Sequence, residues 1–174
     1  MTENTIGNPN APVRIDVWED FQCPFCRKFA QNQEKVLRQS YIPNGQVQLV
    51  FHPFPFLGPE SVLAAQAAEC AATQGRFWDY HDKLFAEQRE ENSGWFNLNH
   101  LDQWAADLGL DVPAFAHCLD HGDQANEVLA SLEQGQLQGV SWTPTVYVNG
   151  QKLPGVPSWP DLEQAIRSAG ARAA

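Results

Sequence analysis

The chain has 174 residues and a net charge of −10, from 11 Lys and Arg residues against 21 Asp and Glu residues. This length suggests one domain of ordinary size, and the acidic excess argues against binding to nucleic acid or to an anionic membrane, which both need clustered cations. Hydrophobic residues make up 43% of the chain, which argues against disorder. No apolar run approaches the ~20 residues of a membrane-spanning helix.

The first third of the chain predicts a strand, a helix and a second strand. Residues 13–18 (VRIDVW) alternate apolar and polar side chains, which is typical of a half-buried strand. A helical stretch follows to about residue 40, and residues 47–52 (VQLVFH) predict the second strand. Two strands joined by a helix over this short length indicate a βαβ unit with parallel strands.

The middle of the chain predicts helices, and strand character returns near the end. After a proline-rich break, helices are expected at residues 61–73, 77–87, 101–108, 112–121 and 125–137. A hairpin with an Asn-Gly turn is then expected from strands at 145–148 and 151–153, followed by a helix at 160–168.

This order, β-α-β, a helical block and then β-β-α, predicts an α/β protein with a thioredoxin fold and an inserted helical domain. We expect the thioredoxin-like core to comprise residues 1–55 and 139–174. The helical insertion would comprise residues 56–138.

Two cysteines stand close together where the first strand ends and the helix begins, in the motif Cys23-Pro24-Phe25-Cys26. A C-x-x-C motif near a βαβ pattern is typical of a redox pair. The first turn of a helix has unpaired N–H groups and a partial positive charge, which lower the pKa of a thiol below its usual value of about 8.5. We therefore expect Cys23 to be the exposed nucleophile and Cys26 to face inward and resolve the mixed disulfide.

A structural disulfide, a zinc half-site and inert thiols are the alternatives for this pair. A structural zinc site needs four ligands, and the sequence has no second C-x-x-C motif. The other cluster of suitable residues is His117, Cys118 and His121. We expect neither a metal nor a cofactor.

The segment before the predicted hairpin contains Thr143-Pro144. By itself this bond would be expected to be trans, since only about 5–6% of X–Pro bonds in folded proteins are cis. In a thioredoxin fold the loop lies opposite the C-x-x-C motif, where a cis bond would offer the backbone of Thr143 to an extended substrate. The expected substrate contacts are Pro24, Phe25, Trp142, Thr143 and Pro144.

Four segments carry a resemblance to a known family: residues 6–13 (IGNPNAPV), 20–26 (DFQCPFC), 75–85 (GRFWDYHDKLF) and 143–150 (TPTVYVNG). Together they resemble the DsbA-like thiol-disulfide oxidoreductases of the thioredoxin superfamily. The resemblance implies a redox-active disulfide between Cys23 and Cys26, a cis Pro144 facing it, and oxidation of cysteines in unfolded exported proteins. It also implies reoxidation by a quinone-linked membrane partner of the DsbB or VKOR type.

One position departs from the family in a way that affects proton transfer. Members often carry a buried Glu six residues before the first cysteine, and that position is Val17 here, flanked by Asp16 and Trp18 on the opposite strand face. If Asp16 points away, Cys26 must exchange its proton with another group or with water.

Two further departures concern the surroundings of the motif. Trp142 stands where the family commonly has a small residue, and a bulky ring beside the substrate groove would narrow the substrate specificity. Phe25 replaces a His of DsbA, so we expect Cys23 to be less acidic than the corresponding cysteine of DsbA, whose pKa is about 3.5.

Cys70 and Cys118 both lie in the predicted helical block. They are either two buried thiols or a structural disulfide, and we favour the disulfide, which would contribute about 2–4 kcal/mol to stability. A disulfide would favour an oxidising compartment.

The polar segment before the first strand shows no export signal. We expect a location outside the cytoplasm, in the periplasm or cell envelope, with the signal or anchor absent from this sequence, although the residues alone leave the cytoplasm open. The expected function is that of a monomeric thiol-disulfide oxidase. A reductase on the same fold and a non-catalytic binding or chaperone module are the alternatives.

Overall fold

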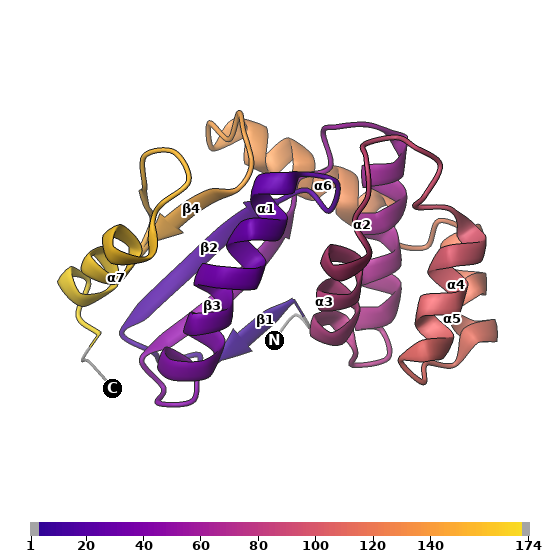
Figure 1. Cartoon of the computed structure of the whole chain (residues 1–174). Helices are drawn as coiled ribbons and strands as arrows, with labels where there is room; N and C mark the ends of the chain where they lie inside the picture. Colours follow the sequence, from indigo (N-terminus) through magenta and orange to yellow (C-terminus); the bar gives the residue numbers. More distant parts are fainter. Residues whose placement is uncertain (1–3, 172–174) are drawn as a thin grey trace.

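The computed structural model describes residues 4–171 and contains a five-stranded sheet with helices around it (Figure 1). The strands are β1 (Thr5–Gly7), β2 (Val13–Glu19), β3 (Val47–Pro53), β4 (Thr145–Val148) and β5 (Gln151–Lys152). The helices are α1 (Pro24–Phe29), α2 (Pro59–Ala72), α3 (Phe77–Glu87), α4 (Leu98–Asp107), α5 (Val112–Asp120), α6 (Ala125–Leu137) and α7 (Trp159–Ser168). After α1 the chain continues through two wider helical turns, η1 (Ala30–Glu34) and η2 (Leu37–Tyr41).

The strands lie in the order β1-β3-β2-β4-β5. β2 and β3 run parallel, as the βαβ pattern predicted, and the other neighbouring strands pair antiparallel. The alternation in β2 buries Val13, Ile15 and Val17 completely and leaves Arg14 exposed. β1 was not predicted, because its three residues carry no strand pattern of their own and pair with the edge of β3.

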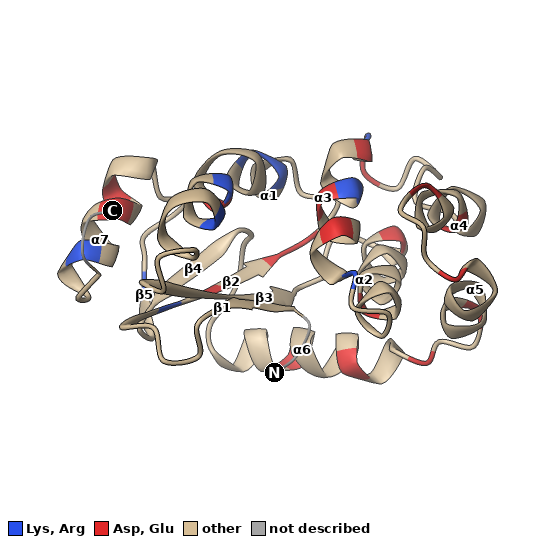
Figure 2. Cartoon of the chain, turned by 90° about the horizontal axis from the view of Figure 1, so that it is seen from below, with Lys and Arg blue, Asp and Glu red and all other residues tan. Residues whose placement is uncertain are grey.

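Helices lie on both faces of the sheet and beside it. Figure 2 shows α1 and α7 on one face and α6 on the other, with α2 to α5 gathered at one side. α6 can approach the sheet closely because of Gly135, where a Cβ atom would lie 2.7–2.9 Å from the rings of Phe54 and Trp18. These two rings and Val140 form a small core under α6.

The helical region and the sheet are therefore in contact through α6, which belongs to the predicted insertion. The division into a core (1–55 and 139–174) and an insertion (56–138) stays a prediction, and residues 1–3 and 172–174 lie outside the described residues.

Across residues 4–171, the structure has no helix with both the length and the apolar character needed to cross a membrane.

A disulfide joins α2 to α5 through Cys70 and Cys118, which are 48 residues apart in the sequence. By constraining the unfolded chain, a bridge of this kind contributes about 2–4 kcal/mol to stability. Because its sulfur is in this bond, Cys118 is not available to bind zinc together with His117 and His121.

Candidate active site

Cys23 and Cys26 lie at the N-terminal end of α1, directly after β2. Cys23 is the N-cap residue, with extended backbone angles, and Pro24 occupies the first turn, where its missing N–H would have had no helical partner. Cys23 is 6% exposed and Cys26 is fully buried. Both are free thiols in the structure, and the difference in exposure makes Cys23 the sulfur that a reagent can reach.

The surroundings of Cys23 favour its thiolate. A hydrogen bond from the Cys26 thiol lowers the pKa of Cys23 to about 6, with help from the Thr143 side chain and from the backbone N–H groups of Cys26 and Phe25, and against the effect of burial. This value lies below that of an ordinary thiol and above that of the DsbA cysteine, about 3.5. At neutral pH, Cys23 is therefore mostly ionised.

Cys26 has the opposite tendency. Burial, the hydrogen bond to Cys23 and the nearby negative charge of Glu19 all raise the pKa of Cys26 well above its usual value. The reduced pair thus consists of one charged and one protonated sulfur, and the single proton of the pair stays on Cys26.

The loop before β4 brings the second predicted segment to Cys23. The Thr143–Pro144 bond is cis. The Cys23 sulfur lies 3.4 Å from the Thr143 carbonyl oxygen, to which it donates a hydrogen bond when it is protonated. Two aromatic side chains of the two segments stay in solvent: Phe25 is 57% exposed and Trp142 is 41% exposed. The sequence-predicted residues around the two cysteines thus meet at one surface, although about 120 residues separate the two segments.

The structure identifies the carboxyl group that the departure at Val17 left open. Asp16 does point away, and its Oδ1 lies 2.7 Å from Nε2 of His52. Glu19, the last residue of β2, is 1% exposed, and its charge acts on Cys26. The sequence analysis missed Glu19, although it follows Val17 by two residues and therefore lies on the buried face of the strand.

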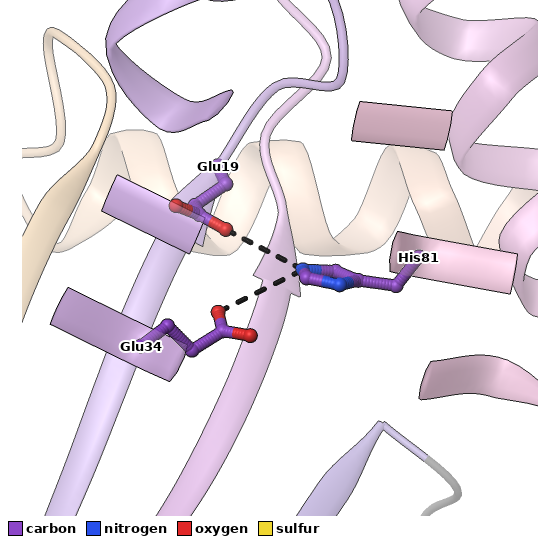
Figure 3. Close-up of side chains that lie close together, drawn as sticks. All are labelled: Glu19, Glu34 and His81. Carbon is purple, nitrogen blue, oxygen red and sulfur yellow. Dashed lines mark ion pairs between the residues drawn. The ribbon is translucent and has the colours of Figure 1, made fainter. Parts of the chain in front are cut away.

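Glu19 belongs to a buried cluster with Glu34 from η1 and His81 from α3. Figure 3 shows both carboxyl groups pointing to the same ring nitrogen, with Glu19 Oε2 at 3.8 Å and Glu34 Oε2 at 3.7 Å from His81 Nε2. Burial raises the pKa of Glu19 to about 8. Burial alone would lower the pKa of His81, but the Glu34 charge and a hydrogen bond with Asp82 raise it to about 9.

The oxygen and nitrogen atoms of this cluster lie within 4.8 Å of one another, a spacing that could suit a metal ion. However, all three side chains are almost completely buried, and a metal ion would need a route into the site. We interpret Glu19, Glu34 and His81 as groups that share protons.

The chain is similar to known proteins over nearly its whole length. The family model described as thioredoxin matches residues 1–168. The probable disulfide bond formation protein D of Bacillus cereus is 31% identical over 169 residues, which cover 95% of this chain and 77% of that protein. The chain belongs to the DsbA-like family of thiol-disulfide oxidoreductases. The predicted enzyme class is thereby confirmed.

The similarity extends to a solved structure of the family. The crystal structure of oxidised BdbD from Bacillus subtilis matches with a TM-score of 0.89 at 26% identity, over 95% of this chain and 91% of that chain. This match confirms the predicted thioredoxin fold. Part of the Na⁺/H⁺ antiporter NhaA 3 of Salinispora tropica is also 33% identical over 96% of this chain, which corresponds to 24% of that protein. Sequences of this family therefore also occur as parts of longer proteins.

Proposed function

We propose that this enzyme is an oxidase that donates a disulfide between Cys23 and Cys26 to cysteines of exported proteins. The observation that supports the proposal is the opposite ionisation of the two sulfurs, with the pKa of Cys23 lowered to about 6 and the pKa of Cys26 raised. Contacts that stabilise the Cys23 thiolate stabilise the reduced form of the protein relative to the oxidised form. The disulfide between Cys23 and Cys26 is therefore readily transferred to a substrate.

The proposed reaction begins with attack of a substrate thiolate on the Cys23 sulfur. The bond between Cys23 and Cys26 breaks, and Cys26 leaves as a thiolate that takes a proton from Glu19. A second substrate thiolate then attacks the substrate sulfur of the mixed disulfide, and Cys23 leaves as a stable thiolate. Two electrons pass from the substrate dithiol to the enzyme, and the substrate gains its disulfide.

We propose that an extended substrate lies along the loop of Thr143 and Pro144. The Thr143 backbone is next to the Cys23 sulfur, and an extended peptide can pair with such a backbone segment as an added strand. Pro24, Phe25 and Trp142 are exposed beside it and offer apolar surface. Unfolded proteins expose apolar side chains, so this surface suits them as substrates.

We propose further that the enzyme works as a monomer outside the cytoplasm, in the periplasm or cell envelope. After each turnover the Cys23 and Cys26 thiols must be reoxidised, and a membrane partner of the DsbB or VKOR type that passes electrons to quinone would do this. The disulfide between Cys70 and Cys118 supports this location, because disulfides persist in oxidising compartments.

The test is the direction of disulfide exchange. We expect the oxidised protein to transfer its disulfide stoichiometrically to a reduced peptide with two cysteines, and to reduce insulin poorly. A redox titration against glutathione, followed by tryptophan fluorescence, then gives the potential of the pair. A potential near that of thioredoxin, about −270 mV, would indicate a reductase, and full activity in Cys23→Ser would exclude any enzyme that uses this site.

A further inference from the structure

Glu19 is a buried acid that lies close to the imidazole of His81. Within residues 4–171, His81 is the cationic side chain that lies within ion-pair distance of it, with 3.8 Å between Glu19 Oε2 and His81 Nε2. Neither Glu19 oxygen has a hydrogen-bond partner among the described residues. The ionisation of Glu19 therefore depends on the charge of His81.

The surroundings of His81 make this dependence strong. The imidazole is enclosed by five aromatic rings, those of Phe21, Phe51, Phe77, Trp78 and Phe85. Charges act on each other more strongly in such an apolar environment than in water. The same His81 nitrogen also faces Glu34 at 3.7 Å, so two buried carboxyl groups lie against one imidazole (Figure 3).

The other ring nitrogen connects His81 to the surface. Its Nδ1 lies 2.9 Å from Asp82 Oδ1, and the guanidinium of Arg38 donates hydrogen bonds to Asp82 at 2.6 Å and to Glu34 at 3.4 Å. The Asp82 side chain is 54% exposed. Asp82 and Arg38, with Gln31 and Lys35, line a surface cavity of about 700 Å³. A carboxylate on Nδ1 fixes the ring orientation and supports its positive charge.

We propose that His81 is a positioning residue for disulfide exchange, and that its charge, held by Asp82 and Glu34, keeps Glu19 able to release and retake a proton for Cys26. This inference rests on the proposed function only for the use that Cys26 makes of the proton.

The physical reason lies in the cost of burying a charge. A carboxyl group in this position without a cation would keep its proton over the whole physiological pH range. It could then protonate the Cys26 thiolate when the disulfide breaks, but it could not accept the proton when the disulfide forms again. With the imidazolium beside it, Glu19 exists in both forms, so it serves the two halves of the redox cycle.

The test follows the ionisation of Glu19 directly, by the infrared absorption of its protonated carboxyl group, identified as the band that Glu19→Gln lacks. In the wild-type protein we expect this band to disappear as the pH rises through the pKa of Glu19, about 8. In His81→Gln we expect it to persist to higher pH. At pH 8 the reoxidation of the dithiol by oxidised glutathione should then be about tenfold slower, because a smaller fraction of Glu19 is ionised and able to accept the proton of Cys26.

Asp82→Asn is the second variant, because its half-exposed side chain can be changed without opening the core. It should shift the Glu19 band in the same direction as His81→Gln, and by less. Asp79→Asn is the matched control, since Asp79 is an exposed carboxylate on the same helix that pairs with Arg76 and not with His81.

Coincident titrations of the Glu19 band in the wild-type protein, His81→Gln and Asp82→Asn would overturn the inference. If His81→Gln does not fold, Asp82→Asn compared with Asp79→Asn decides the question alone. If the wild-type protein does not exchange disulfides at all, the proposed function fails, whereas the infrared titration still tests the control of Glu19 by His81.

Discussion

The protein contains two pairs of cysteines that differ in chemistry although all four sulfurs are largely buried. Cys70 and Cys118 connect two helices through a disulfide, and this structural role requires no ionised thiol. Cys23 and Cys26 lie at a helix N-terminus, next to a backbone carbonyl on one side and near a buried carboxyl group on the other.

The comparison shows that burial alone does not decide the role of a cysteine. Burial raises the pKa of any thiol, and at Cys26 this effect prevails. At Cys23 the hydrogen bond from Cys26 and the N–H groups of the first helical turn outweigh it. Position relative to a helix end therefore separates a reactive pair from a structural one.

The largest effect is expected from Cys23→Ser, which removes the sulfur that forms the mixed disulfide. Disulfide transfer to a reduced peptide should fall to the background rate. The double variant Cys70→Ser with Cys118→Ser should keep the transfer rate within about twofold, because distant sites act independently. A double variant as inactive as Cys23→Ser would remove the distinction between the two pairs.

The same double variant should show its effect in stability. Loss of the bridge between α2 and α5 should lower the free energy of unfolding by about 2–4 kcal/mol, measured by denaturant titration. The pKa of Cys23 should not move. A stability equal to that of the wild-type protein would mean that this bridge constrains little in the unfolded chain.

Glu19→Gln should slow both halves of the redox cycle by at least about tenfold at neutral pH, because Cys26 loses its proton donor and acceptor. Removal of the Glu19 charge should also lower the pKa of Cys26, which that charge helps to raise. Stopped-flow fluorescence can measure both half-reactions. Asp16→Asn is the control, since Asp16 lies on the opposite face of the same strand; an equal loss in this variant would contradict the role of Glu19.

The smallest effect is expected at the exposed aromatic side chains. Trp142→Ala should raise the KM for an unfolded protein about fivefold, because partial burial of such a ring on binding contributes ~1 kcal/mol. Exchange with glutathione, which is too small to cover this surface, should not change. Leu98→Ala is the matched control, since Leu98 is a similarly exposed apolar side chain on α4.

Much of the fold follows from sequence patterns. The alternation in β2, the Asn-Gly turn before β5 and the motif at Cys23 each depend on neighbouring residues, so a local pattern is enough to predict them. β1 and the wide turns after α1 have no such pattern, because pairing and packing with distant segments determine them.

In the candidate site, too, the parts formed by neighbouring residues could be predicted from the sequence, and the parts formed by distant residues could not. Only two residues separate Cys23 and Cys26 in the sequence, and the family resemblance added the loop at Pro144. The cluster of Glu19, Glu34 and His81 comes from β2, η1 and α3, and only the folded chain brings these groups together. Period-two alternation places Glu19 on the buried face, but it does not show which cation meets it there.

The most direct test of this account is the reaction of the reduced Cys23–Cys26 pair with iodoacetamide as a function of pH, with the bridge between α2 and α5 left intact. Only the thiolate reacts, and the pKa of Cys23 is lowered to about 6. The rate should therefore be nearly constant above neutral pH and fall as the pH decreases through 6, with the label on Cys23. A midpoint near that of an ordinary thiol, about 8.5, or a label found on Cys26 instead, would contradict the account.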